Sequence, residues 1–384
     1  MEHSLLKKIK EKKYLYIIVF VVGIFSLIKG FAIHPHPYAL SQYLYTYEGG
    51  FLVRGLLGQT ASLLFDADYV QIKKLVEIIS ICFVLLFFVA INLTFLNISN
   101  NREENLLLFL IIVSGPLLVS IGSTRGYHDA LMLSLGLFSY NFFVDKKYII
   151  SIILLSIAIL IHEIVTVYIL PLLALHLIDY KIDPLRKIIT ILFITILTIT
   201  VLIIGKADNN QVQILKSKIA ESTSVLSNGW EGYQKYGPHA ALRKPPSHWQ
   251  SLRFKERLMD VFRNILHKRN ASYLSINIVL IILGIYITLK NKSLFKTIYI
   301  LALFLSPHII HLIAWDSNRF LSLSTLTSCF ILLHLINKNY GSLKKILRFC
   351  APVLVIIQIC TDYDVIEQYA GNETLLRAVL SVLR

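Results

Sequence analysis

The candidate functional residues of this sequence are acids, histidines and arginines that interrupt or border apolar segments, since these side chains can transfer protons or bind charged ligands. The clearest are His162 and Glu163, two adjacent ionisable residues in the middle of the largely apolar stretch between Tyr148 and Ile178. Ionisable side chains inside membrane-spanning sequence are costly, so they are a functional-site hypothesis by default. We therefore predict that His162 and Glu163 are catalytic. The alternative is a polar turn that merely reaches interfacial water.

The flanks of this stretch indicate how deep the pair lies. Lys146 and Lys147 precede it and basic residues follow it, and basic residues beside span ends prefer the cytoplasm. The chain should go out over 148–161, turn at His162-Glu163 and return over 164–178, which carries Pro171. Arms of about 21 Å cannot cross about 30 Å of hydrocarbon. The pair is thus expected below the outer surface, in a water-filled or protein-lined cavity.

A second group of candidate residues lies in the segment YEGGFLVRG. Glu48 is followed by Gly49 and Gly50, which allow a tight turn and the close approach of a ligand. Desolvation near an apolar surface would raise the proton affinity of Glu48, which suits a general base. Arg54, about a turn and a half further on, could pair with Glu48 or hold a phosphate.

Two further polar turns each precede an apolar segment. In the first, Arg125 offers a bidentate fork for phosphate, His128 can shuttle a proton, and Asp129 can cap the following helix or act as a base. In the second, Asp316 is the candidate cap and Arg319 the candidate phosphate fork. The alternative for Arg319 is an ion pair with Asp316, three residues earlier.

The longest hydrophilic segment, residues 206–270, contains further candidate substrate-binding residues. Its middle is rich in Pro, Gly and aromatic residues, which is typical of a loop that orders on binding. The side chains that we expect to contact substrate here are His239, Arg243, His248 and Trp249. A basic amphipathic helix is predicted over 251–269.

Composition identifies the elements that must position these residues. The chain has 384 residues, of which 55% are hydrophobic, and a mean hydropathy of +0.65. Its apolar residues form continuous blocks of membrane-spanning length, which predicts a polytopic helical membrane protein and excludes an alternating β-barrel pattern. Because much of the net charge of +15 lies beside span ends, it does not indicate nucleic acid. Any surplus suits anionic lipid or phosphate ligands.

We predict an all-α fold with about eleven transmembrane helices in one domain, 1–384. The spans are placed at about 14–33, 75–97, 105–121, 128–144, 148–161, 164–178, 187–205, 271–289, 294–313, 318–337 and 346–361. With the N-terminus in the cytoplasm, the candidate residues above all fall on the outer side. Residues 206–270 then form a large extracytoplasmic loop, followed by C-terminal helices over 271–384.

The sequence lacks the motifs that identify several other classes of enzyme. There is no HExxH, P-loop, GxGxxG or GxSxG motif. The four cysteines fall in apolar segments without metal-like spacing. His308 and His311 could be metal ligands, but no third ligand is adjacent, and such pairs are more often hydrogen-bonded helix residues. We predict no metal site and no required cofactor, although a carboxylate cluster could recruit a divalent ion such as Mg²⁺ or Mn²⁺.

Several features together resemble the GT-C class of membrane glycosyltransferases, which use polyprenyl-phosphate-linked donors. These are Glu48 within two expected amphipathic helices over 38–65, Arg125 to Asp129 before an apolar span, and a short helical pair with a polar tip and Pro171. The family usually has Lys at that tip, where this chain has His162-Glu163. The resemblance covers roughly residues 1–180. The chain also resembles the polytopic polymerases of bacterial O-antigen and capsule synthesis in its span count, large outer loop and outer arginines.

The resemblance implies glycosyl transfer at the outer face of the bacterial cytoplasmic (inner) membrane, with a polyprenyl (di)phosphate as leaving group. Arg54, Arg125 and Arg319 would hold the phosphate, as preorganised cations do in transfer reactions. Glu48, or in its place Glu163 or Asp129, would deprotonate the acceptor, and Trp249 could stack on the sugar. Membrane lipid and other glycan-assembly membrane proteins are the expected partners, and nucleic acid is not.

Three other classes of function stay open. A lipid-linked glycan flippase or transporter fits the span count, although a central pathway should also place ionisable residues near the midplane and in both vestibules. A membrane O-acyltransferase would use an outer or buried histidine, such as His128 or His162. A non-catalytic scaffold would not need ionisable residues gathered on one side.

The topology yields a direct prediction. Single cysteines placed at positions 48, 125 and 163 should all react with a membrane-impermeant thiol reagent from the same, outer side of the membrane, because one pocket holds all three. Labelling at 48 and 163 from opposite sides would contradict the single outer pocket.

Overall fold

The computed structural model describes residues 13–31, 42–48, 50–51, 54–65, 69–99, 103–124, 126–179, 184–204, 210–211, 213–214, 217–218, 271–289, 294–312, 317–338 and 343–361. These residues form helices and short helical turns, and no β-strand occurs among them. The predicted all-α class is therefore confirmed. They divide into two compact units, the first drawn from 1–34, 92–123 and 260–384 and the second from 35–91 and 124–259.

Four helical segments are long and apolar enough to cross a membrane. They are Tyr14–Phe31 in α2 (Lys13–Phe31), Lys74–Ile98 in α5 (Tyr69–Ile98), Glu103–Ser123, and Arg319–Asn337 in α19 (Ser317–Asn337). The third consists of α6 (Glu103–Ser114) and α7 (Pro116–Ser123). A break falls between them because Pro116 has no N–H to continue the ladder of α6 and suits the first position of a new helix.

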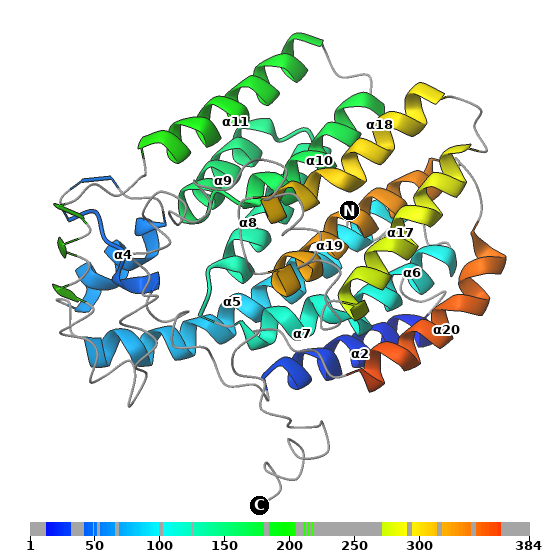
Figure 1. Cartoon of the computed structure of the whole chain (residues 1–384), viewed down its shortest axis with the longest axis horizontal. Helices are drawn as coiled ribbons and strands as arrows, with labels where there is room; N and C mark the ends of the chain where they lie inside the picture. Colours follow the sequence, from blue (N-terminus) through cyan, green and yellow to red (C-terminus); the bar gives the residue numbers. More distant parts are fainter. Residues whose placement is uncertain are drawn as a thin grey trace, which may run out of the picture. The chain divides into compact units, whose positions relative to one another are not determined.

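In the first unit, α2 packs against α6 and α7 through two glycines. A Cβ added at Gly30 would lie 2.5 Å from the Val119 carbonyl oxygen, and one added at Gly122 would lie 3.1 Å from the Leu27 carbonyl oxygen. Small residues let two helix backbones approach in this way, as is common between membrane helices. Helix α20 (Lys344–Cys360) packs on α6, beside α2 (Figure 1).

In the first unit, Lys29 joins α2 to the C-terminal end of α20. Lys29, which is 8% exposed, donates hydrogen bonds to the carbonyl oxygens of Ile359, at 3.3 Å, and Thr361. These carbonyls lie at the C-terminus of α20, where the last turn leaves acceptors unpaired and the helix dipole favours a cation. Residues 330 positions apart thus share one contact.

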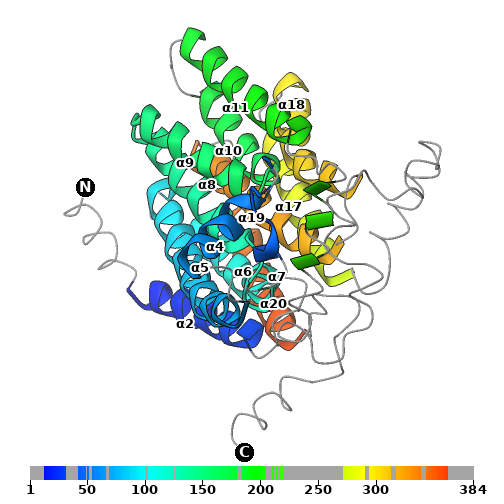
Figure 2. The ribbon, with the colours of Figure 1, turned by 90° about the vertical axis from the view of Figure 1, so that its left-hand side faces the viewer.

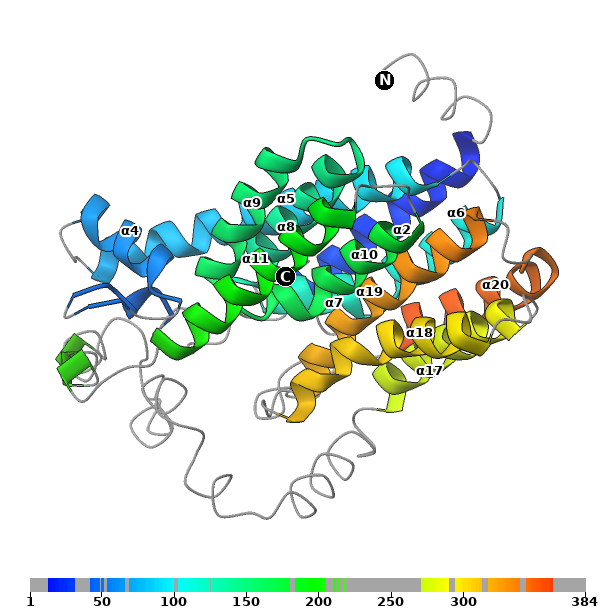
Figure 3. The same cartoon turned by 90° about the horizontal axis from the view of Figure 1, so that it is seen from above.

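The rest of the first unit is formed by α17 (Ala271–Leu289), α18 (Leu294–Leu305), the 3-10 helix η3 (Ser306–Leu312) and α19. Figure 3 shows α17 beside α18, where Gly284 leaves room for the ring of Phe304. The buried Asn277 side chain donates to the carbonyl oxygens of Tyr273 and Leu321, which joins α17 to α19. Both hydrogen bonds of the Asn277 amide nitrogen are thus made inside the protein, as apolar surroundings favour.

The second unit contains the 3-10 helix η1 (Gln42–Leu44), α4 (Gly55–Phe65), the start of α5, and a group of four helices. These four are α8 (Asp129–Val144), α9 (Tyr148–Ile161), α10 (Val165–Asp179) and α11 (Pro184–Ile204). Helices α9 and α10 both pack mainly against α8 (Figure 2). Gly136 of α8 allows this, because a Cβ there would lie 2.6 Å from Ile169.

The predicted helical pair is confirmed to within a residue. Helix α9 ends at Ile161 and α10 begins at Val165, so His162 and Glu163 form the break between them, and Pro171 lies inside α10. The hydropathy pattern located this break because two adjacent ionisable residues interrupt a long apolar run. Both helices fall among the shorter apolar helices of 10–17 residues.

Helix α4 is the α-helix that the structure describes in the expected amphipathic region over 38–65. Its small residues Gly55, Gly58 and Ala61 are buried, whereas Leu63 and Leu64 are exposed. At Gly58 a Cβ would collide with the carbonyl oxygen of Tyr45, so only glycine lets α4 pack on the segment that follows η1. The exposed leucines agree with a helix that lies in the membrane interface.

This contact makes a prediction for stability. Gly58→Ala should lower the thermal unfolding temperature of the purified protein in detergent, with a loss of about 1–3 kcal/mol from overpacking. Helix propensity alone would raise stability by about 1 kcal/mol, so the sign of the change identifies the steric clash. Thr60→Ala, at an exposed position of the same helix, is the control and should change stability little. An unchanged or raised unfolding temperature for Gly58→Ala would contradict the close contact.

Candidate functional site

The second unit contains a partly buried ion pair between Arg54, which directly precedes α4, and Glu163, which lies in the break between α9 and α10. Arg54 Nη2 donates to Glu163 Oε1 at 2.7 Å, and Arg54 Nε approaches Glu163 Oε2 at 3.4 Å. The side chains are only 22% and 14% exposed. This is the two-point geometry in which a guanidinium fits a carboxylate, and it fixes the plane of the Arg54 side chain.

Arg54 reaches Glu163 from a backbone conformation that non-glycine residues seldom adopt. Its φ is 67°, and it immediately precedes α4, which begins at Gly55. Such left-handed residues cost about 1–3 kcal/mol, and they cluster at functional sites. The turn starts at Gly50, whose φ of 127° is open to glycine alone. Packing of α4 on η1 and on α9 holds this strained residue in place.

His162 supports the carboxylate from its other side. It caps the C-terminus of α9 in an extended conformation, and its Nδ1 lies 3.2 Å from Glu163 Oε2. Nδ1 also accepts a hydrogen bond of 3.4 Å from the Ile164 backbone N–H. Glu163 is therefore paired with Arg54 and lies in contact with the His162 ring.

Both pKa values of this pair are lowered. Burial by itself would raise the pKa of Glu163, but the charge and hydrogen bonds of Arg54 and the contact with His162 outweigh it and hold that pKa well below its usual value. Burial lowers the pKa of His162, and Arg54 lowers it further, although the Glu163 carboxylate opposes this. At neutral pH the site thus holds an ionised Glu163 and a neutral His162.

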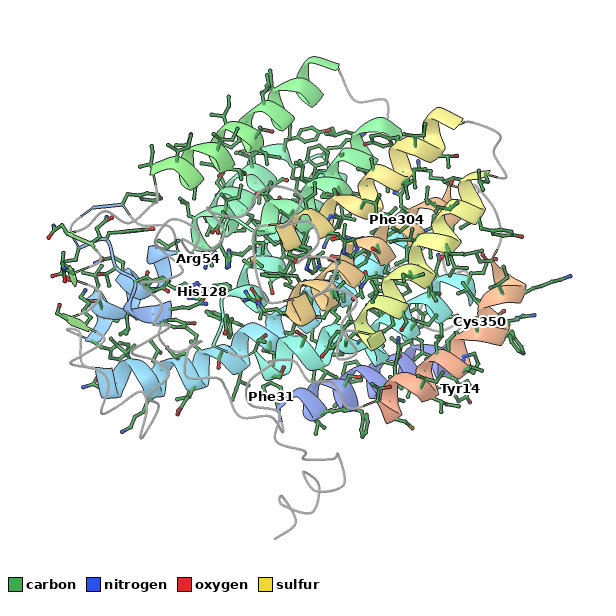
Figure 4. All side chains as sticks on the ribbon, in the orientation of Figure 1. Tyr14, Phe31, Arg54, His128, Phe304 and Cys350 are labelled. Atoms are coloured by element: carbon green, nitrogen blue, oxygen red, sulfur yellow. The ribbon has the colours of Figure 1, made fainter. Side chains whose placement is uncertain are left out.

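His128 and Asp129 belong to the same electrostatic cluster. His128 precedes α8 and is fully buried, and its ring meets that of Tyr43 edge-on with centroids 5.1 Å apart. Charges on His162, Arg54 and Asp129 all act on the His128 ring. Figure 4 shows Arg54 and His128 close together. Four candidates from distant parts of the sequence are thus brought together with Glu163.

The expected capping role of Asp129 is only partly seen. The residue at the N-cap position of α8 is His128, whose side chain makes no capping hydrogen bond, and Asp129 lies one position inside, in the first turn. A carboxylate there still complements the helix dipole. Both ring nitrogens of His128 are buried, and the polar group that faces them, the Ile161 carbonyl, lies outside normal hydrogen-bond geometry.

Glu48 has a different environment. Its side chain is 61% exposed and forms an ion pair with Lys218, whose Nζ also donates to Thr46 Oγ1 at 2.7 Å. Arg54, which the sequence offered as a partner for Glu48, pairs with Glu163 instead. Glu48 borders an open pocket of about 390 Å³ that is lined by Thr46, Tyr47, Glu48, Gln59 and Ser62.

Arg319, His308 and His311 belong to the first unit. Arg319 is 6% exposed and lies over the ring of Phe320, 5.2 Å from its centroid. The rings of His308 and His311 stack with centroids 5.8 Å apart. Among the residues described, neither nitrogen of His311 has a hydrogen-bond partner, which differs from the hydrogen-bonded helix histidines we considered more common.

Several candidates lie outside the described residues: Arg125, His239, Arg243, His248, Trp249 and Asp316. The structure adds Lys218 and Tyr43, which sequence reasoning missed. Lys218 is one of many lysines in a long polar segment, so nothing in the sequence distinguishes it. Tyr43 follows shortly after the HPHPY motif, and only its contact with His128 identifies it.

The described residues thus form an all-helical structure with four helical segments long and apolar enough to cross a membrane and a partly buried Arg–Glu–His cluster. Among the residues described, no group of three or more His, Cys, Asp or Glu side chains is arranged to hold a metal ion. A scan against protein-family models and searches of curated proteins and of solved structures found no match to this chain.

The ion pair predicts strong energetic coupling. Glu163→Gln and Arg54→Met should each destabilise the protein by about 2 kcal/mol or more, because each removes one charge of a partly buried, two-point ion pair. The double variant should lose less than the sum, with a coupling of about 1–3 kcal/mol. Chemical unfolding in detergent measures all four proteins.

The matched control is the exposed two-point pair of Glu103 and Arg348, with bonds of 2.6 Å. Because the Arg348 side chain is 56% exposed, the same cycle on Glu103→Gln and Arg348→Met should give less than about 1 kcal/mol. Equal coupling in the two cycles would contradict a special role for burial at Arg54 and Glu163.

Proposed function

We propose that this chain is a membrane glycosyltransferase that moves a sugar or glycan repeat from a polyprenyl (di)phosphate donor to an acceptor hydroxyl on the outer face of the membrane. The observation that carries the proposal is the buried, two-point pair of Arg54 and Glu163 beside His162 and His128. The second unit thus contains the oriented guanidinium of Arg54, the imidazoles of His128 and His162, and a second carboxylate, that of Asp129.

Arg54 is the group suited to the donor. A guanidinium matches phosphate geometry as it matches a carboxylate, and Glu163 holds it in a fixed plane before any ligand arrives. As the bond between the anomeric carbon and the phosphate oxygen breaks, its electron pair and negative charge pass to the leaving (di)phosphate. A preorganised cation lowers the energy of that developing charge. Arg125 and Arg319 stay predicted contributors.

Glu48 is better placed than Glu163 to deprotonate the acceptor. Glu163 is fully engaged by Arg54 and His162, and its lowered pKa makes it a weak base. Glu48 is mostly exposed and borders an open pocket. The acceptor oxygen would form a bond to the anomeric carbon while its proton passes to the Glu48 carboxylate and the (di)phosphate leaves. Glu163 and His162 then act as positioning residues for Arg54.

The proposal includes a GT-C-like layout with about eleven spans, a cytoplasmic N-terminus, and a site open to the periplasm or exterior of a bacterial cytoplasmic membrane. It is supported by four helices of spanning length, by shorter apolar helices such as α8 to α10, and by the exposed leucines of α4. O-antigen or capsule synthesis is the proposed process, alongside other membrane proteins of glycan assembly. No step needs a metal, although Mg²⁺ or Mn²⁺ could assist.

A membrane O-acyltransferase is the second candidate, and one observation favours it. His128 is fully buried with neither nitrogen in a normal hydrogen bond, and a neutral imidazole of this kind could take a proton from an acceptor hydroxyl during acyl transfer. In that case the cell-surface glycan would keep its sugars and lose ester-linked acyl groups when the chain is deleted.

The test is complementation of a deletion strain. Glu48→Gln, Arg125→Ala and Glu163→Gln should each abolish sugar or polymer addition, seen as a shifted glycan profile on gels, while the protein still accumulates in the membrane. The loss of a general base alone should cost at least about 100-fold in rate in a membrane assay with a polyprenyl-linked donor.

Glu103→Gln is the control, since it removes an arginine-paired acid at the surface of the first unit and should leave the profile intact. Wild-type profiles for all three site variants would reject the transferase. Accumulation of inward-facing lipid-linked sugar in the deletion strain would favour a flippase instead.

A further inference from the structure

The pocket beside Glu48 has a composition that identifies a ligand class. Its volume of about 390 Å³ falls within the roughly 300–1,000 Å³ of small-molecule sites. Two hydroxyls, a side-chain amide and a carboxylate line it, with Tyr47 as the aromatic member. Such a lining offers many directed hydrogen bonds and little apolar surface, so it suits a polyhydroxylated ligand better than a lipid chain.

The aromatic wall of the pocket is pre-formed. The rings of Tyr47 and Phe51 stack with centroids 5.5 Å apart at 20°, and the Tyr47 backbone N–H donates to Gln59 Oε1 at 2.8 Å. The turn closes with a bond of 3.0 Å from the Gly50 N–H to the Tyr47 carbonyl. An aromatic face combined with polar groups at its edge is a surface on which the apolar face of a sugar ring can stack.

The start of the long segment 206–270 closes one side of this region. Gln211 Nε2 donates to the Phe51 carbonyl at 3.3 Å, and Lys218 contacts both Thr46 and Glu48. A second, much smaller cavity lies here, lined by Leu44, Tyr45, Thr46, Glu48, Gln211, Ile214 and Lys218. Glu48 therefore borders both cavities, with Lys218 holding its carboxylate.

We propose that this pocket binds one terminal sugar residue of a saccharide acceptor, with Gln59, Ser62 and Thr46 as its recognition residues and Lys218 as the positioning residue for Glu48. That the bound sugar belongs to the acceptor rests on the proposed function. The sugar-binding pocket itself is inferred from its geometry alone. A saccharide, and not a protein side chain or a lipid, is thus the group that receives the transferred sugar.

A size-based pair of variants tests the pocket. Ser62→Trp fills it, whereas Thr60→Trp places the same bulk two residues away on α4, at an exposed position outside the lining. Saturation-transfer NMR on the full chain in detergent uses the methyl glycosides of glucose, galactose, mannose and their N-acetylated hexosamines as probes. Wild type and Thr60→Trp should show saturation transfer to at least one probe, and Ser62→Trp should lose it.

A second test of the pocket measures the kinetics of the transfer reaction. Ser62→Trp should raise KM for the acceptor by about tenfold or more, with KM for the polyprenyl-linked donor unchanged, because the pocket touches only the acceptor. Lys218→Met should lower kcat and shift its pH profile, and Lys218→Arg should restore both, since a merely structural lysine would not move the profile.

The outcomes separate the two proposals. Probe binding that depends on Ser62, without any glycosyl transfer, would reject the proposed function and keep the sugar pocket. Transfer whose acceptor KM is the same in Ser62→Trp and Thr60→Trp would keep the function and overturn the pocket. Equal saturation transfer in those two variants, or none in wild type, would also overturn it.

Discussion

The ion pair between Arg54 and Glu163 is the interaction on which the candidate site depends. It joins a strained residue at the start of α4 to the break between α9 and α10, 109 positions later. Glu163 offsets the charge that Arg54 carries into this partly buried place. The same contact orients the guanidinium and lowers the pKa of the Glu163 carboxyl, while burial and Arg54 lower the pKa of His162. Folding and the electrostatic character of the site are therefore linked through one contact.

Close backbone contacts make this arrangement possible. Gly58 lets α4 lie on the backbone near Tyr45, and Gly136 lets α10 lie on α8. Arg54 directly precedes α4, and Glu163 lies between the end of α9 and the start of α10, so the approach of these helices sets the distance between the two side chains.

The sequence predicted the local features well and the partners poorly. Hydropathy located the break at His162-Glu163 because two charges interrupt a long apolar run, and it identified the helical class for the same reason. The pairing of Arg54 with Glu163 was not predictable, since local spacing offered only Glu48 as a partner. Lys218 and Tyr43 were missed because tertiary packing alone brings them to Glu48 and His128. His128, Asp129 and Arg54 were identified singly, without any sign that they act on one another.

The bond from Lys29 to the end of α20 has a consequence for biosynthesis. Helix α2 emerges from the ribosome about 330 residues before the carbonyl of Ile359 is made. At about 5–20 residues per second, the ammonium group waits tens of seconds for these acceptors. During that interval a nascent or truncated chain carries this cation, in a helix long and apolar enough to cross a membrane, before these carbonyl acceptors exist. Completion of the first unit is thereby tied to the synthesis of α20.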